Sequence, residues 1–378
     1  RRGVPVPPLL GKSLFLTCAK DFWMPRQDTL RRFILFTFIG STTAPGILST
    51  LHLSLFVVLP SILLSLSIVI ITYYSVRRAW GQQGLYLYTK ELGPVASKAF
   101  LFTWLISYYL YVVYTAIYIP YYVLNLDGTL PIILSIIIPV SVFSLVTFTD
   151  PLYAFPLIYS FQILFSLPLG WKVGLGTTPP ITSLFINILS SSLLLVCITL
   201  STFAKGDKSK DSPFILYSFL ISSIILLYGT FLVPPPYTVI ASAWGNYGLI
   251  LAELTAINNL LRPIAGAKKT FYLNFAIIPL TILGNLNYSL FYNTLLVPSV
   301  TFLYFSLLIF ALSTLKIIKG IPKVFSLVSA FLFAFGEYNV LRGTTGVLFG
   351  EALIAFLIGV LFVPSVYILS RASKGKVK

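Results

Sequence analysis

One interrupted hydrophobic segment indicates the fold class: residues 33–48 read FILFTFIGSTTAPGIL. Pro45 cannot donate a hydrogen bond to the preceding helical turn, so at least one carbonyl loses its partner. Hydrocarbon cannot satisfy a freed carbonyl, so such a break should face protein or a water-lined cavity. We therefore predict a discontinuous helix over residues 32–50. Its substrate-binding groups are predicted at Gly40, Ser41, Thr42, Thr43, Ala44 and Gly46. A proline kink with hydroxyls bonding back into the helix is the alternative.

The composition places the whole chain in a bilayer. Of its 378 residues, 57% are hydrophobic and 10% charged, with a mean hydropathy of +0.93. A soluble domain carries roughly 25% charged residues, which excludes a cytosolic enzyme, a secreted disulfide scaffold and a disordered chain. The apolar runs are continuous and do not alternate with period two, so helices are favoured over a β-barrel.

Segments separated by proline, glycine and charged residues predict an all-α integral membrane protein with about 12 transmembrane helices. The predicted spans are 32–50, 54–77, 98–124, 130–148, 152–169, 179–203, 213–233, 238–262, 270–285, 288–314, 321–337 and 346–370. This gives a transmembrane domain of residues 32–370 between tails of residues 1–31 and 371–378. Two interpretations of the N-terminus stay open: the natural chain begins at Met24, or residues 1–23 form a flexible cytoplasmic tail.

The formal net charge of +16 tests this topology, because lysine and arginine accumulate on the cytoplasmic side of membrane proteins. With both termini in the cytoplasm, 24 of the 26 basic residues lie inside, and only Lys172 and Arg342 lie outside. We therefore predict a multi-pass protein of the cell membrane. Its basic loops set topology and attract anionic membrane lipid, and nucleic acid is not expected as a partner.

No cofactor and no metal is predicted. The single histidine, His52, excludes a haem held by a histidine pair and argues against histidine-based zinc or copper sites. Cys18 and Cys197 provide neither a disulfide framework nor metal-binding spacing.

The region after the second predicted helix carries a further motif, GQQGLYLYTKELGP at residues 81–94. Together with the interrupted first helix, it resembles the amino acid–polyamine–organocation (APC) permease superfamily over residues 33–105, with a weaker echo near 204–213. The matching residues are Gly40, Ser41, Gly46, Ile47, Gly84, Tyr86, Tyr88, Leu92, Gly93, Pro94 and Trp104. The departures are Ala44, Pro45, Gln83 and Thr103, at positions where the family often has glycine or a small hydroxyl residue.

The resemblance implies two inverted five-helix repeats, helices 1–5 and 6–10, plus two peripheral helices. It also implies a second break in helix six, for which Ser190, Ser191 and Ser192 are the candidates. A serine run can also bond to helix carbonyls without unwinding the helix, and this alternative stays open.

Tyrosines recur every three or four residues along the third helix, at Tyr108, Tyr111, Tyr114, Tyr118 and Tyr122. They line one helical face. Tyr111 is predicted to contact substrate, with packing between helices as the alternative.

Glu253 is the sharpest single signal, because a carboxylate within a span is costly and usually faces a cavity or a partner. Burial favours its protonated form, which suits a proton carrier. The alternative is a glutamic acid bonded to the exposed backbone of a neighbouring helix. Sodium sites in related folds use a pair of hydroxyls on this helix; only Thr255 is present, so protons are favoured over sodium as the coupling ion.

The other carboxylates are assigned no transport role. Glu351 is expected to pair with Arg342 or to be hydrated, and Asp127, Asp150 and Glu337 are placed in loops. Glu91 and Lys90 are expected to have structural partners in a cytoplasmic loop.

The predicted function is a secondary active transporter of a small-molecule substrate, an amino acid or related amine, with alternating access and proton coupling. No enzyme is predicted, because membrane transferases need carboxylates, histidine or metal ligands at the membrane face. A non-catalytic subunit of a membrane complex stays open. So does a transporter of another fold, such as the major facilitator type, although the central loop of about nine residues is short for it.

Overall fold

The computed structural model describes residues 54–171, 180–204, 206–362 and 365. The predicted break of the first helix, including Gly40 to Gly46, lies outside these residues, as do both predicted tails.

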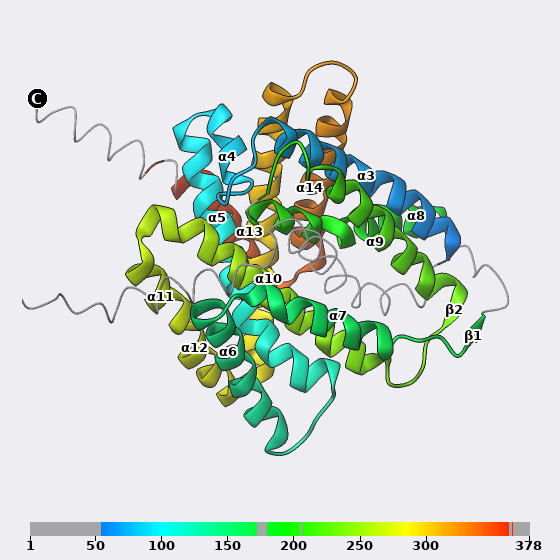
Figure 1. Cartoon of the computed structure of the whole chain (residues 1–378), viewed down its shortest axis with the longest axis vertical. Coiled ribbons are helices and arrows are strands. Elements are labelled where there is room, and N and C mark those ends of the chain that lie inside the picture. The colour runs from blue at the N-terminus through cyan, green and yellow to red at the C-terminus, as the bar shows by residue number, and fades with distance from the viewer. Residues whose placement is uncertain (1–53, 172–179, 205, 363–364, 366–378) are drawn as a thin grey trace, which may run out of the picture.

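The described chain is nearly all helical (Figure 1). Its α-helices are α3 (Leu55–Arg78), α4 (Tyr86–Thr89), α5 (Pro94–Tyr118), α6 (Leu130–Phe148), α7 (Ala154–Leu164), α8 (Ile181–Ser192), α9 (Pro213–Phe231), α10 (Thr238–Ala265), α11 (Ala267–Phe275), α12 (Ile277–Gly284), α13 (Tyr288–Ile317), α14 (Lys323–Gly343) and α15 (Gly346–Leu357). The 3₁₀ segments are η1 (Lys90–Leu92), η3 (Pro151–Tyr153), η4 (Leu193–Phe203) and η5 (Asn285–Asn287), and the π-helical turns are η2 (Ile119–Val123) and η6 (Ile358–Phe362). Two short strands, β1 (Gly170–Trp171) and β2 (Leu232–Val233), pair antiparallel with Gly170 opposite Val233.

Seven helical segments within the described residues are long and apolar enough to cross a membrane, which confirms an integral membrane fold. The predicted span 130–148 coincides with α6, and the span 54–77 differs from α3 by one residue at each end. The predicted count of 12 spans and the five-plus-five repeat stay predictions.

Two predicted spans differ from the structure because of prolines. The span 152–169 ends early, at Leu164, and the span 270–285 is divided into α11 and α12. Pro168 and Pro279 lie four residues after Leu164 and Phe275, the last residues of α7 and α11. Proline has no N–H to donate to the carbonyl four residues earlier, and its ring collides with that carbonyl, so each helix stops there.

Helix α5 lies at the centre and packs against both α10 and α13 (Figure 1). Small residues allow its close approach to α13: Ser107 Oγ donates to the Ser299 carbonyl at 2.7 Å, and Ser299 Oγ donates to the Ser107 carbonyl at 2.8 Å. Such small-residue contacts with reciprocal hydrogen bonds are typical of helix pairs in membranes. Trp104 and Tyr108 of α5 and Phe310 of α13 are among the largest fully buried side chains of the described chain.

The motif at residues 81–94 forms a compact turn before α5. Gly84 and Gly93 both have positive φ, 53° and 103°, a conformation that favours glycine. Pro94 then begins α5 at a position where its missing N–H costs nothing. Between them, Tyr88 Oη donates to the Ala79 carbonyl at 2.6 Å, and burial raises the pKa of this phenol well above its usual range.

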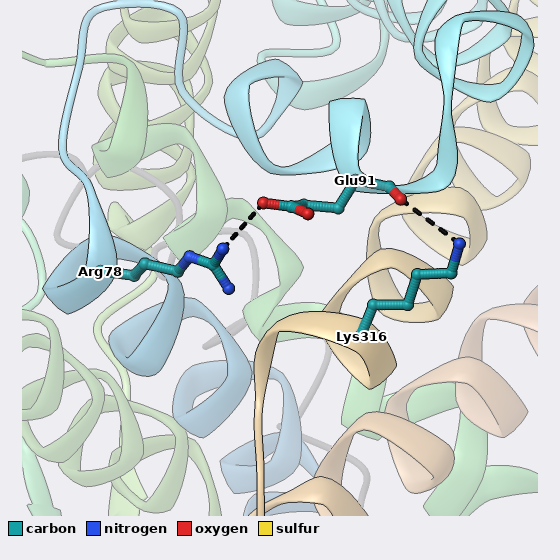
Figure 2. Close-up of polar contacts among 3 residues, drawn as sticks. All are labelled: Arg78, Glu91 and Lys316. Carbon is teal, nitrogen blue, oxygen red and sulfur yellow. Dashed lines mark hydrogen bonds and ion pairs between the residues drawn. The ribbon is translucent and has the colours of Figure 1, made fainter.

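Glu91 connects the ends of three elements (Figure 2). Its carboxylate pairs with Arg78 at the end of α3 at 2.9 Å, and its carbonyl accepts a bond of 3.3 Å from Lys316 at the end of α13. Lys90 Nζ donates to Gln83 Oε1 at 3.0 Å. The expected structural partners of Lys90 and Glu91 are thereby confirmed.

Candidate functional site

Glu253 lies in the middle of α10 with its side chain 1% exposed. Within the described part of the chain, neither carboxylate oxygen has a hydrogen-bond partner. The alternative in which Glu253 bonds to the backbone of a neighbouring helix is therefore not seen among these residues. A buried carboxyl without a partner is costly in a membrane and marks a functional position by default.

Groups on two other elements surround this carboxyl. Tyr108, Tyr111 and Tyr114 of α5 and Cys197 of η4 all lie within electrostatic range of Glu253. The predicted coupling residue Glu253 and the predicted substrate residue Tyr111 therefore lie in the same region of the bundle, and their roles stay predictions.

The tyrosine face of α5 also packs against other aromatic side chains. Trp104 lies between Tyr108, at a centroid distance of 4.6 Å, and Phe203 of η4, at 4.3 Å. Farther along α5, the ring centroids of Tyr114 and Tyr118 each lie 5.4 Å from the ring centroid of Tyr292 of α13. This face thus serves in helix packing, while its central part also faces Glu253.

The predicted break in helix six coincides with a change of helix type. The α-helical hydrogen bonding of α8 ends at Ser192, and the 3₁₀ helix η4 begins at Leu193 and runs for 11 residues. Runs of 3₁₀ helix longer than three or four residues are uncommon and often mark a hinge. Ser192 Oγ donates to the Leu189 carbonyl at 2.6 Å, as expected of a serine that bonds within its helix.

Side chains from other elements hold both ends of η4. At its beginning, Ser65 Oγ of α3 donates to the Ser192 carbonyl at 2.7 Å, and one turn earlier Ser61 Oγ donates to the Ile188 carbonyl at 2.9 Å. At its end, Asn259 Nδ2 of α10 donates to the Phe203 carbonyl at 3.0 Å. The Trp80 indole donates to the Ala204 carbonyl at 2.9 Å.

Thr255, the other predicted coupling residue, is buried two residues beyond Glu253. Its hydroxyl donates to the Leu251 carbonyl of its own helix at 2.6 Å. The hydroxyl proton is therefore already engaged, and its role in coupling stays a prediction.

The structure corrects the placement of Glu337. This residue was expected in a loop, but α14 continues to Gly343 and places Glu337 on the buried face of the helix. Leu332 and Phe333 lie four and three residues before Gly336, and this helical spacing could have indicated the buried face.

Glu351 lies half-buried on α15 and forms no ion pair with Arg342 among the described residues.

A cavity of about 490 Å³ lies beyond the C-terminal end of α5. Lys98, in the first turns of α5, lies at the opposite end of this helix. The cavity lining includes Tyr121, Asp127, Asn285 and Tyr288. Asn285 Oδ1 accepts hydrogen bonds from Tyr121 Oη at 3.0 Å and from Ser135 Oγ at 2.9 Å, so this amide links η2, α6 and η5.

No family model and no curated protein matches the chain. Two solved structures of variants of a manganese transporter from Eremococcus coleocola match it with TM-scores of 0.50 and 11% sequence identity. Each match covers 94% of this chain and 98% of the other. This similarity establishes a shared fold. Together with the membrane-length helices, it defines a multi-pass membrane protein with the fold of a membrane transporter.

Proposed function

We propose that the protein is a secondary active transporter that moves an amino acid or a related amine by alternating access with proton coupling. The observation that carries the proposal is Glu253, buried at the centre of the helix bundle with no hydrogen-bond partner in the described part of the chain. A carboxyl in this setting can take up a proton from one side and release it to the other. The transporter fold and the resemblance to the APC superfamily support the same conclusion.

The surroundings of Glu253 suit a small cationic substrate. Phenol rings such as Tyr108 and Tyr111 attract ammonium groups through their faces, and an ionised carboxylate adds the opposite charge. The neighbouring change from α8 to η4 provides an element whose hydrogen bonding can change while a helix bundle moves.

A metal ion is the second candidate substrate, because the shared fold is that of a manganese transporter. Manganese prefers hard oxygen ligands, and Glu253 could supply one of them. If the protein takes up Mn²⁺ and no amino acid or amine, the substrate is a metal ion and the amine proposal is wrong. Hydrolysis or group transfer on a lipid-linked substrate would instead identify an enzyme.

The test is uptake into proteoliposomes that contain the purified full chain. Labelled amino acids, amines and Mn²⁺ are offered with and without an inward proton gradient. We expect accumulation of at least one amino acid or amine that increases when the gradient is imposed. A protein that moves none of these compounds would be a non-transporting membrane subunit, and the proposal would fail.

The variant Glu253→Gln keeps the shape of the side chain but cannot ionise. We expect it to reduce gradient-driven accumulation on the order of tenfold, the scale of a typical coupling free energy, while substrate exchange at equal pH continues. Glu351→Gln is the matched control, since Glu351 lies half-buried on the peripheral helix α15. Full gradient-driven uptake by Glu253→Gln would remove Glu253 from the coupling role.

A further inference from the structure

A second carboxyl lies inside the helix bundle without a partner. Glu337 of α14 is 6% exposed, and neither of its oxygens has a hydrogen bond within the described residues. It lies 14 residues beyond Lys323, the first residue of α14, or roughly 21 Å along the helix axis from the basic end. This depth is about two thirds of the way across a hydrocarbon core that is about 30 Å thick.

Close packing connects Glu337 to α13 and η4. A Cβ atom on Gly336 would lie 3.0 Å from ring atoms of Tyr304 and 3.0 Å from Leu193 Cδ1. Because Gly336 has no side chain, the Tyr304 ring lies directly against the α14 backbone, one residue from Glu337. Tyr304 interacts electrostatically with Glu337 on one side and with Cys197 on the other.

Cys197 continues the connection to the candidate site. It lies on η4 and interacts electrostatically with Glu253 as well as with Tyr304. Cys197 and Tyr304 therefore lie in the region between the two buried carboxyls, with Tyr304 packed against the α14 backbone beside Glu337.

The other titratable groups of the elements around α14 do not pair with Glu337. The elements that pack against α14 are α3, α8, η4, α13 and α15. Their titratable side chains in the described chain are Tyr73, Tyr74, Arg77, Arg78, Cys197, Tyr288, Tyr292, Tyr304, Lys316 and Glu351, and α14 itself adds Lys323, Tyr338 and Arg342. None of the described cations forms an ion pair with Glu337. In the absence of such a pair, a proton is the simplest cation to neutralise this buried carboxyl.

We propose that Glu337 is a second proton-binding site of the transport cycle, connected to Glu253 through Cys197 and Tyr304. This inference rests on the proposed function. In each transfer, the Cys197 sulfur and the Tyr304 oxygen each bind a proton on one side and release the proton of their own S–H or O–H on the other. The thiol and the phenol therefore both end neutral, and only the two carboxyls change charge.

Infrared spectroscopy of the purified full chain in lipid nanodiscs tests this assignment without any substrate. A protonated carboxylic acid has its own C=O stretching band, which disappears on ionisation. We expect Glu337→Gln and Glu253→Gln each to remove a different component of this band, and each component to titrate with pH. Glu351→Gln is the control for loss of a half-buried carboxyl. A band that is unchanged in Glu337→Gln, or a Glu337 component that does not respond to pH, would overturn the proposal.

The connection itself is tested by Tyr304→Phe, which removes only a hydroxyl. We expect the titration midpoint of the Glu337 component to shift, whereas Tyr338→Phe should leave it unchanged because Tyr338 is 57% exposed. Thermal unfolding of both variants establishes that they fold. If the Glu337 component has the same titration midpoint in Tyr304→Phe as in the wild type, Tyr304 does not connect Glu337 to Glu253.

Proton stoichiometry separates this inference from the proposed function. With the amino acid or amine of highest uptake, we expect Glu337→Gln to lower the number of protons moved per substrate from two to one. A wild-type protein that moves no protons would defeat proton coupling as a whole. A wild-type protein that moves one proton, with Glu337→Gln unchanged, would defeat only the role of Glu337.

Discussion

Gly84 combines two requirements that only glycine meets without strain. Its φ of 53° lies in the left-handed region, and a Cβ atom here would lie 2.4 Å from a ring atom of Phe203. Phe203 cannot move away easily, because its other contacts include the stacked indole of Trp104. The glycine of the 81–94 motif is therefore explained by packing against the end of η4.

We predict that Gly84→Ala destabilises the protein by about 2 kcal/mol or more, the combined cost of left-handed backbone and overpacking. Thermal unfolding in detergent measures the effect. Gly81→Ala is the matched control, since its Cβ would lie 3.9 Å from the nearest atom, on Leu87, and its φ is not in the left-handed region. Equal stability of the two variants would contradict this account.

The two buried carboxyls show how far sequence alone reaches at the residue scale. Glu253 could be identified because it lies near the middle of a predicted span, far from either end. Glu337 was missed because the predicted span 321–337 ended on it, whereas α14 continues for six more residues. The close approach of Tyr304 to the neighbouring Gly336 depends on the packing of α13 against α14, which no local pattern encodes.

At the scale of elements, the junction of α8 and η4 is the feature that sequence indicated only in part. The serine run was the candidate for a break, with bonding inside an unbroken helix as the alternative. In the structure α8 ends at Ser192, and the rest of the predicted span is the 3₁₀ helix η4. Two serines of α3 donate hydrogen bonds to the end of α8: Ser61 to the Ile188 carbonyl and Ser65 to the Ser192 carbonyl. The two donors are four residues apart in the sequence, and so are the two acceptors. This matched spacing aligns α3 and α8 in parallel, and it becomes visible only once the two helices are packed.

We predict that the double variant Ser61→Ala and Ser65→Ala lowers the free energy of unfolding by about 1 kcal/mol, since interhelical hydrogen bonds in membranes average about 0.6 kcal/mol each. Denaturation with increasing amounts of ionic detergent measures it. Ser223→Ala is the control, because Ser223 Oγ bonds only to the Phe219 carbonyl of its own helix. An effect no larger than that of the control would mean that the two bonds do not hold the junction.

At the scale of the whole molecule, two of the described basic residues, Arg78 and Lys316, lie where several helix ends are tied together. Glu91 joins the ends of α3 and α13, and Asn259 of α10 bonds to the end of η4, which also accepts a bond from Trp80 beyond α3. Arg78 and Lys316 thus meet at one end of the bundle, and the predicted charge bias of the whole chain stays a prediction. The cavity at Tyr121 and Asp127 lies at the other end of α5. A polarity of this kind can be predicted from sequence because charge placement depends on loops and needs no knowledge of packing, and which end faces the cytoplasm stays a prediction.

Cysteine labelling in intact cells tests which end faces the cytoplasm. In a background with Cys18→Ser and Cys197→Ser, we expect Asp127→Cys to react with a membrane-impermeant maleimide from outside. Lys319→Cys, in the exposed loop between α13 and α14, should react only after the membrane is permeabilised. The physical reason is that lysine and arginine in short loops are retained on the cytoplasmic side during insertion. The reverse pattern would place the basic end outside. The cavity at Asp127 would then open to the cytoplasm, and the direction of the proton gradient in the uptake assay would have to be exchanged.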